Sequence, residues 1–276
     1  MNAAELFREI QKKKSFLCVG LDTDIHKIPK HLKDDTDPVF AFNRAIIDAT
    51  IPYTVAYKPN MAFYEADGTE GWNSLQRTIN YIKSKSPDVL VIADAKRGDI
   101  GNTSAMYAAT FFEHMNADAV TLSPYMGKDT ALPFLQYKDK WSVLLALTSN
   151  ESASDYQYFE GINGRRLYEE VLHTSRKWAS VDQLMYVVGA TKAEELKKIR
   201  KIIPEYFLLV PGVGAQGGDL KSVVENGMNR QCGLLINSSR GIIYASSGED
   251  FAERAAEKTR ELQNEMENLL TTAGLI

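Results

Sequence analysis

Residues 88–103 read DVLVIADAKRGDIGNT and indicate the fold class more clearly than any other stretch of the chain. The apolar run at 89–93 follows turn-forming residues, which is typical of a strand buried on both faces of a parallel sheet. Four charged residues come where this run ends: Asp94, Lys96, Arg97 and Asp99. Because α/β folds build their sites at the carboxyl ends of parallel strands, we expect a functional site here.

The spacing of these charges predicts their geometry. Residues two apart in a strand point to the same side, so the Asp94 carboxylate and the Lys96 ammonium should face one space, with Asp99 close by on the following loop. A lysine between two carboxylates offsets their repulsion and is itself kept protonated. Such a lysine can donate a proton, although this motif alone is equally typical of an ordinary ion pair at a strand end.

Seven more apolar segments read as strands, and helical patterns alternate with them. The other expected strands are 15–21, 53–57, 117–122, 141–147, 184–188, 206–210 and 234–236. The expected helices are 3–13, 38–48, 72–83, 102–115, 129–137, 165–178, 193–203, 220–226 and 249–270. No linker divides them, so the sequence predicts a single (β/α)8 TIM barrel over 1–276 with an extra N-terminal helix; a doubly wound sheet is the alternative.

A second polar site is expected after the last two strands. The stretch PGVGAQGGDL at 211–220 is rich in glycine, which lets backbone amides approach an anion closely, although tight helix–strand packing would also explain the glycines. Gln216 and Arg240 can add side-chain donors, and Arg240 can form two parallel hydrogen bonds to a phosphate. A phosphate site at this place is common in barrels, which favours the barrel over the doubly wound sheet.

Composition excludes several other classes. The chain has a formal net charge of -4 and no long basic run, so a nucleic-acid surface is not expected. No apolar run has the length of a membrane span, and the N-terminus lacks the order of a signal peptide. Cys18 and Cys232 read as buried thiols, which fits a reducing, cytoplasmic location. The histidines are too scattered for a metal site, and no metal is expected.

Three motifs in this order carry a family resemblance. They are DAKRGDIGNT from Asp94, PGVGAQGG from Pro211, and Ser239-Arg240. Together they resemble the orotidine 5'-phosphate decarboxylases, in the longer form found in many bacteria, over nearly the whole chain. The resemblance implies loss of CO2 from orotidine 5'-phosphate to give UMP in pyrimidine biosynthesis, without metal or cofactor.

The resemblance also implies roles for individual residues. Lys96 would protonate C6 of the pyrimidine, with Asp94 beside the departing carboxylate. Asp22 and Lys58 would hold ribose hydroxyls and complete a charge chain with these two. The remaining implied contacts are Asp99, Ile100 and Thr103 reaching the partner site of a homodimer, Ser149 at the pyrimidine edge, and Gln216 and Arg240 on the 5'-phosphate, with Pro211 and Ser239 beside them.

Three other functions remain open at this point. Lys96 could be the unprotonated nucleophile of a Schiff-base lyase or aldolase, although flanking carboxylates oppose that role. A Mg²⁺-dependent sugar-phosphate lyase shares the shorter D-x-K-x-x-D pattern. A phosphate-ligand binding protein without catalysis is the third. The loop at 151–164 matches no motif and reads as a surface lid or a dimer contact.

Overall fold

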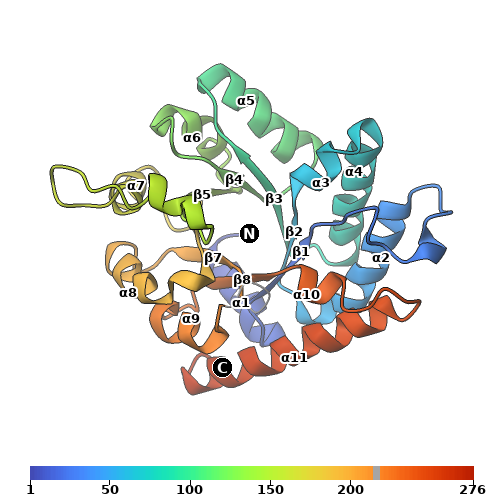
Figure 1. Cartoon of the computed structure of the whole chain (residues 1–276). Coiled ribbons are helices and arrows are strands. Elements are labelled where there is room, and N and C mark those ends of the chain that lie inside the picture. Colours follow the sequence, from blue (N-terminus) through green and yellow to red (C-terminus); the bar gives the residue numbers. More distant parts are fainter. Residues whose placement is uncertain (214–217) are drawn as a thin grey trace.

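The structure is a computed structural model that describes residues 1–213 and 218–276. Within these residues, eight parallel strands pair in chain order and close into a barrel (Figure 1). The strands are β1 (Leu17–Leu21), β2 (Ala56–Pro59), β3 (Leu90–Arg97), β4 (Ala119–Leu122), β5 (Trp141–Leu147), β6 (Leu184–Val188), β7 (Phe207–Pro211) and β8 (Leu234–Ser238). The predicted barrel is confirmed, and the doubly wound alternative is wrong.

Helices surround the barrel and connect its strands (Figure 1). They are α1 (Ala3–Lys13), α2 (Pro38–Thr50), α3 (Met61–Glu65), α4 (Gly68–Lys85), α5 (Gly101–Ala109), α6 (Lys128–Leu135), α7 (Leu167–Ser175), α8 (Ala193–Ile202), α9 (Leu220–Gly227), α10 (Arg240–Ile243) and α11 (Phe251–Thr272). The extra N-terminal helix is therefore present. It is held at the amino ends of the strands, because Trp141 Nε1 donates to Met1 O and Ala3 N donates to Asp182.

The core lies inside the barrel and between the strands and helices. Every residue of β1, β2, β4 and β6 is buried, as expected for strands covered on both faces. Tyr57, Trp141 and Tyr186 are among the largest side chains that are fully buried. Burying a large apolar side chain contributes about 1.5–3 kcal/mol, so this core is rigid enough to fix the side chains at the strand ends.

Several predicted boundaries are wrong. β2 begins at Ala56 rather than at 53, because Ile51–Tyr53 forms a 3-10 turn that contains Pro52. β3 continues to Arg97, past the charges that were expected to end it. The short helices α3 and α10 were not predicted, and both begin directly after residues that lie at the mouth of the barrel. As a result, charged residues that were expected in the loops belong to the last residues of the strands.

Candidate active site

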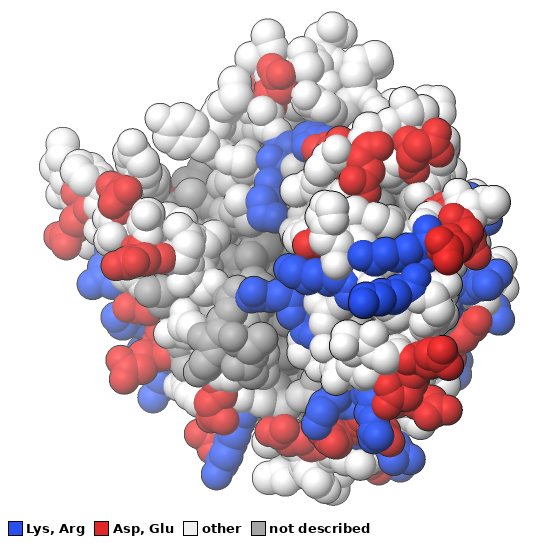
Figure 2. Space-filling model, turned by 45° about the vertical axis from the view of Figure 1, so that its right-hand side comes forward, with Lys and Arg blue, Asp and Glu red and all other residues white. Residues whose placement is uncertain are grey.

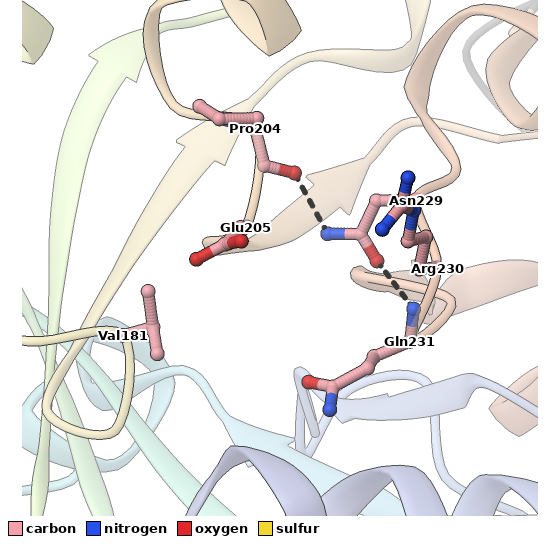
Figure 3. Close-up of a pocket in the computed structure, with 6 residues that line it drawn as sticks. All are labelled: Val181, Pro204, Glu205, Asn229, Arg230 and Gln231. Carbon is pink, nitrogen blue, oxygen red and sulfur yellow. Dashed lines mark hydrogen bonds between the residues drawn. The ribbon is translucent and has the colours of Figure 1, made fainter.

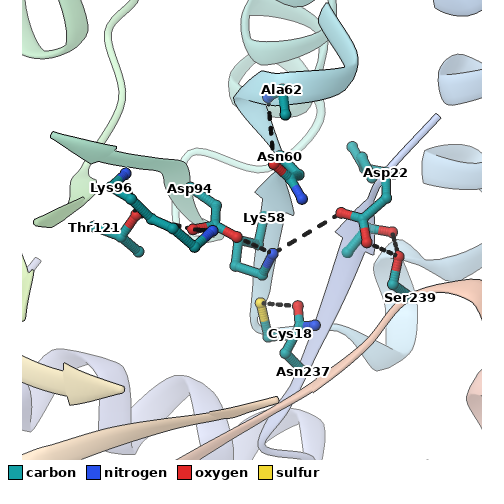
Figure 4. Close-up of polar contacts among 12 residues, drawn as sticks. Cys18, Asp22, Lys58, Asn60, Ala62, Asp94, Lys96, Thr121, Asn237 and Ser239 are labelled. Carbon is teal, nitrogen blue, oxygen red and sulfur yellow. Dashed lines mark hydrogen bonds and ion pairs between the residues drawn. The ribbon is translucent and has the colours of Figure 1, made fainter. Parts of the chain in front are cut away.

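Four charged side chains form a row across the carboxyl ends of β1, β2 and β3 (Figure 4). Lys58 Nζ lies 4.0 Å from Asp22 Oδ1 and 2.9 Å from Asp94 Oδ2. Lys96 Nζ lies 2.7 Å from Asp94 Oδ1. The predicted pairing of Asp94 with Lys96 is thus present, and the row alternates in sign from Asp22 to Lys96.

Burial and charge act against each other in the middle of this row. Burial alone would raise the pKa of Asp94, but the Lys58 and Lys96 ammonium groups outweigh it and hold the pKa well below its usual range. Burial would lower the pKa of Lys58, but the Asp94 and Asp22 carboxylates outweigh it and raise the pKa. Both groups are therefore charged at neutral pH, and the Lys96 side chain, 49% exposed, is the end of the row that meets solvent.

Ser239 fixes the other end of the row. Its hydroxyl lies 2.7 Å from Asp22 Oδ2 and donates a hydrogen bond to it. Gly20 makes this approach possible, because a Cβ at Gly20 would lie 2.7 Å from Ser239 Cβ. Asp22 Oδ1 is buried and accepts no hydrogen bond from any residue that the structure describes. This oxygen is therefore available to a hydroxyl of a bound ligand.

Asp99 does not contribute to the row within one chain. Among the described residues it forms no ion pair with Lys96, and its Oδ1 instead accepts a hydrogen bond from the Ile100 N–H at 2.7 Å. The expectation that Lys96 is held between Asp94 and Asp99 is thus not met by a single chain. Ile100 is 60% exposed, and Thr103 lies in the first turn of α5, so this segment faces outward.

The expected phosphate end lies where β7 and β8 finish. Pro211 ends β7, and Arg240 begins α10 directly after Ser239. The Arg240 side chain forms no ion pair or hydrogen bond with any described residue and lines a hollow of about 770 Å³. Gln216 lies outside the described residues, so its predicted role is not tested by the structure.

Most of the charged side chains that line this hollow are basic. Its charged and histidine residues are His26, Lys27, Lys30, His31, Lys33, Arg240 and Glu249. Lys27 pairs with Asp24 at 3.4 Å, whereas Lys30 and Lys33 form no ion pair with described residues. Figure 2 shows lysine and arginine side chains gathered beside a hollow on this face. An anion would be attracted to this side of the barrel mouth.

Ser149 follows β5 and is held in position by β6. A Cβ at Gly189, the residue after β6, would lie 2.8 Å from Ser149 Cβ, so only glycine allows the two segments to approach this closely. Ser149 therefore lies at the carboxyl ends of the strands, as predicted. Its expected contact with a pyrimidine stays a prediction.

A second hollow lies at the opposite end of the barrel and is unrelated to this chemistry. It has a volume of about 700 Å³ and is lined by Val181, Pro204, Glu205, Asn229, Arg230 and Gln231, which precede β6, β7 and β8 (Figure 3). Asn229 Nδ2 donates to Pro204 O, and Gln231 N donates to Asn229 Oδ1. These bonds order the loops at the amino ends of the strands, where barrels carry stability rather than catalysis.

The described residues lack two further features. In 1–213 and 218–276, no group of three or more His, Cys, Asp and Glu side chains is arranged to hold a metal ion. None of the described helices is both long and apolar enough to cross a membrane. Cys18 and Cys232 are buried free thiols, as predicted.

Three polar residues at this site were missed from the sequence. Asn60 bridges to Asp94 and caps α3, Asn237 lies 3.6 Å from the Cys18 thiol, and Thr121 contacts both Asp94 and Lys96 (Figure 4). Each is a polar residue within or directly after an apolar strand. That position was the available signal, because a buried polar group in a strand must have a partner.

Comparisons with known proteins identify the family of this chain. A family model described as "Orotidine 5'-phosphate decarboxylase / HUMPS family" matches residues 15–255. The orotidine 5'-phosphate decarboxylase of Phocaeicola vulgatus is 58% identical over 270 residues, covering 98% of this chain and 99% of that protein. The one of Porphyromonas gingivalis is 58% identical over 276 residues, covering 100% of both.

Solved structures show the same relationship. The Leishmania donovani OMP decarboxylase has a TM-score of 0.80 and 36% identity, covering 96% of this chain and 100% of that one. A putative Toxoplasma gondii orotidine-monophosphate-decarboxylase has a TM-score of 0.83 and 34% identity, covering 96% and 97%. With a charged row at the barrel mouth and these relatives over its full length, the chain belongs to the orotidine 5'-phosphate decarboxylase / HUMPS family.

Proposed function

We propose that this protein converts orotidine 5'-phosphate to UMP and CO2 in pyrimidine biosynthesis, and that it does so as a single domain over residues 1–276. The observation that carries the proposal is the charged row from Asp22 to Lys96, which ends in an ammonium group at the mouth of the barrel. Membership of the family indicates the substrate. The row of charged side chains provides the proton donor that decarboxylation of this substrate needs.

Lys96 is the proposed proton donor. The bond between C6 and the carboxylate carbon breaks, its electron pair stays on C6, and a proton from Lys96 Nζ then forms the C6–H bond. Negative charge on that ring carbon is poorly delocalised, so a fixed ammonium aimed at it stabilises the charge as it develops. The half-exposed Lys96 side chain can then regain its proton from water.

Asp94 and its neighbours position the reacting groups. Asp94 holds Lys96 at 2.7 Å and lies beside the departing carboxylate. Repulsion between the two carboxylates would add ground-state strain. Asp22 and Lys58 bind the ribose hydroxyls, and Asp22 Oδ1 can accept a hydrogen bond from one of them because no described residue donates to it. Ser149 meets the pyrimidine edge.

The phosphate end is remote from the reacting carbon. Arg240 binds the 5'-phosphate together with Gln216, beside Pro211 and Ser239. Arg240, whose side chain has no partner among the residues that the structure describes, and the basic hollow next to it support this assignment. Binding energy gained here can be used to close the site and exclude water at C6.

A homodimer is the proposed assembly, in the cytoplasm. Asp99, Ile100 and Thr103 of one chain reach the site of the other. Exposed apolar side chains support an interface around α5 and α6: Ile100, Met106, Tyr125, Met126 and Leu132 are 40–84% exposed. Exposed apolar side chains that gather on neighbouring elements, as on α5 and α6, are typical of protein–protein contacts.

A spectrophotometric assay with orotidine 5'-phosphate, with and without EDTA, tests the function. We expect conversion to UMP that EDTA does not change. No turnover would leave a binding protein, and loss of turnover with EDTA would favour a metal-dependent lyase. Trapping of substrate on Lys96 by borohydride would instead show a Schiff base.

Arg240→Ala is expected to raise KM for orotidine 5'-phosphate by about 10- to 100-fold, because a hydrogen bond to a charged group contributes about 1.5–3 kcal/mol. The chemical step should be affected less, since Arg240 acts at the far end of the substrate. Steady-state kinetics measure both quantities. Arg230→Ala, at the opposite end of the barrel, is the matched control and should leave KM unchanged. Normal affinity in the Arg240 variant would contradict the phosphate assignment.

A further inference from the structure

Thr121 is a buried polar residue in the apolar strand β4, with 1% of its surface exposed. Its hydroxyl takes part in two hydrogen bonds (Figure 4). Oγ1 accepts one from the Lys96 N–H at 2.9 Å and donates one to Asp94 Oδ1 at 2.9 Å. A single hydroxyl group therefore contacts both the main chain of Lys96 and the carboxylate of Asp94.

The pairing of β3 with β4 explains why this hydroxyl is needed. Ala93 pairs with Val120 and Arg97 pairs with Leu122, so the register shifts between them. Three residues of β3 thus lie opposite Thr121 alone, and the strands lose their regular hydrogen bonds there. In this bulge the Lys96 N–H donates its hydrogen bond to the Thr121 side chain.

Lys96 also has an unusual backbone conformation. Its φ of 50° lies in the left-handed region, which residues with a Cβ seldom adopt. Such conformations persist only where surrounding contacts hold them, and they are concentrated at functional sites. The Thr121 bond to the Lys96 N–H is one such contact, and the bulge that it stabilises turns the lysine side chain toward Asp94.

The two partners of the Thr121 hydroxyl determine the direction in which it donates its hydrogen bond. The Lys96 N–H can only donate, and the ionised Asp94 carboxylate can only accept, so the hydroxyl proton is directed to Asp94 Oδ1. The same oxygen accepts a hydrogen bond from Lys96 Nζ at 2.7 Å. The main-chain nitrogen and the ammonium of Lys96 are therefore both tied to one carboxylate oxygen, the first through Thr121 and the second directly.

We propose that Thr121 is a positioning residue for this reaction, which holds the Lys96 ammonium and the Asp94 carboxylate in the geometry needed for protonation of C6. This inference rests on the proposed function. It gives a residue of β4 a role in the site. None of the sequence motifs includes Thr121, which lies outside the segment that carries Asp94 and Lys96.

Two variants, Thr121→Val and Thr121→Ser, distinguish a positioning role of the hydroxyl from a role of the side chain in packing alone. Valine keeps the size of the side chain and removes the hydroxyl. We expect kcat to fall by about 10- to 100-fold, because small displacements of reacting groups cause losses of this size. KM and the affinity for UMP should change little. Serine retains the hydroxyl and should keep kcat within about threefold of the original protein. Thermal unfolding of each variant reports on folding separately.

Ser142→Ala is the matched control. Ser142 lies in the neighbouring strand β5, is 1% exposed, and its hydroxyl forms no hydrogen bond within the part of the chain that the structure describes. Removing this buried hydroxyl should leave kcat unchanged. If Thr121→Val does not fold, Thr121→Ala provides the same comparison with serine.

Three outcomes would overturn the inference: an unchanged kcat in Thr121→Val, an equal loss of kcat in Thr121→Ser, or a change confined to KM. Failure of the proposed function can be told apart from failure of this inference, because the unaltered protein would then not turn over orotidine 5'-phosphate at all.

Discussion

Lys96→Ala is expected to lower kcat for decarboxylation by roughly 10⁴-fold or more, because it removes both the proton donor and the charge that stabilises the carbanion. Binding of UMP should survive within about threefold, since Arg240 and the ribose contacts remain. The site should stay folded: Asp94 keeps hydrogen bonds from Lys58 and Thr121 after the lysine is lost. Single-turnover kinetics and calorimetry with UMP measure the two effects.

The control for this variant is Lys258→Ala. Lys258 is an exposed lysine of α11 that, among the described residues, pairs with Glu261 alone, three residues along the same helix. Its loss should change neither kcat nor UMP affinity. If Lys96→Ala retained kcat within tenfold, the assignment of the proton donor would have to be abandoned.

The architecture could be predicted from local patterns because each strand of this barrel is a largely apolar run that ends near polar residues, glycine or proline. Boundaries were predicted less well for a physical reason. β3 was expected to end near Asp94, since charges are costly inside a buried strand. It continues to Arg97 because Asp94 and Lys96 pair with each other and with Lys58 at the open mouth of the barrel.

The charged row could be predicted in part from the sequence. Asp22, Lys58, Asp94 and Lys96 each follow or end an apolar run, and parallel strands bring such residues together at one end of a sheet. Thr121 could not be predicted in this way. Its contacts depend on the register shift between β3 and β4, which is a property of two strands paired in space.

Lys96 was expected to lie between two carboxylates, but a single chain places only one of them beside it. Asp94 is in contact with the lysine, whereas Asp99 is not. If Asp99 completes the site of a partner chain, each site of a twofold-symmetric dimer needs Lys96 from one subunit and Asp99 from the other. This arrangement makes an experiment with mixed subunits decisive.

Asp99→Ala alone is expected to lower kcat by about 10²- to 10⁴-fold, because a carboxylate that holds the reacting ammonium in place is lost. Mixing it with Lys96→Ala should restore activity. After equal mixing and subunit exchange, half of the dimers pair the two variants, and each such dimer has one intact site of two. Activity should then reach about a quarter of the level of the original protein.

Two results would distinguish the alternatives. Exchange of subunits can be followed with differently tagged chains, and recovery should rise at the rate at which mixed dimers form. A mixture that exchanges subunits fully but stays inactive would show that Asp99 acts within its own chain. Asp99 would then have to turn from the Ile100 N–H, its partner in the structure, toward Lys96 when substrate binds. Recovery instead requires that the two residues act across the interface, since neither variant can supply an intact site by itself.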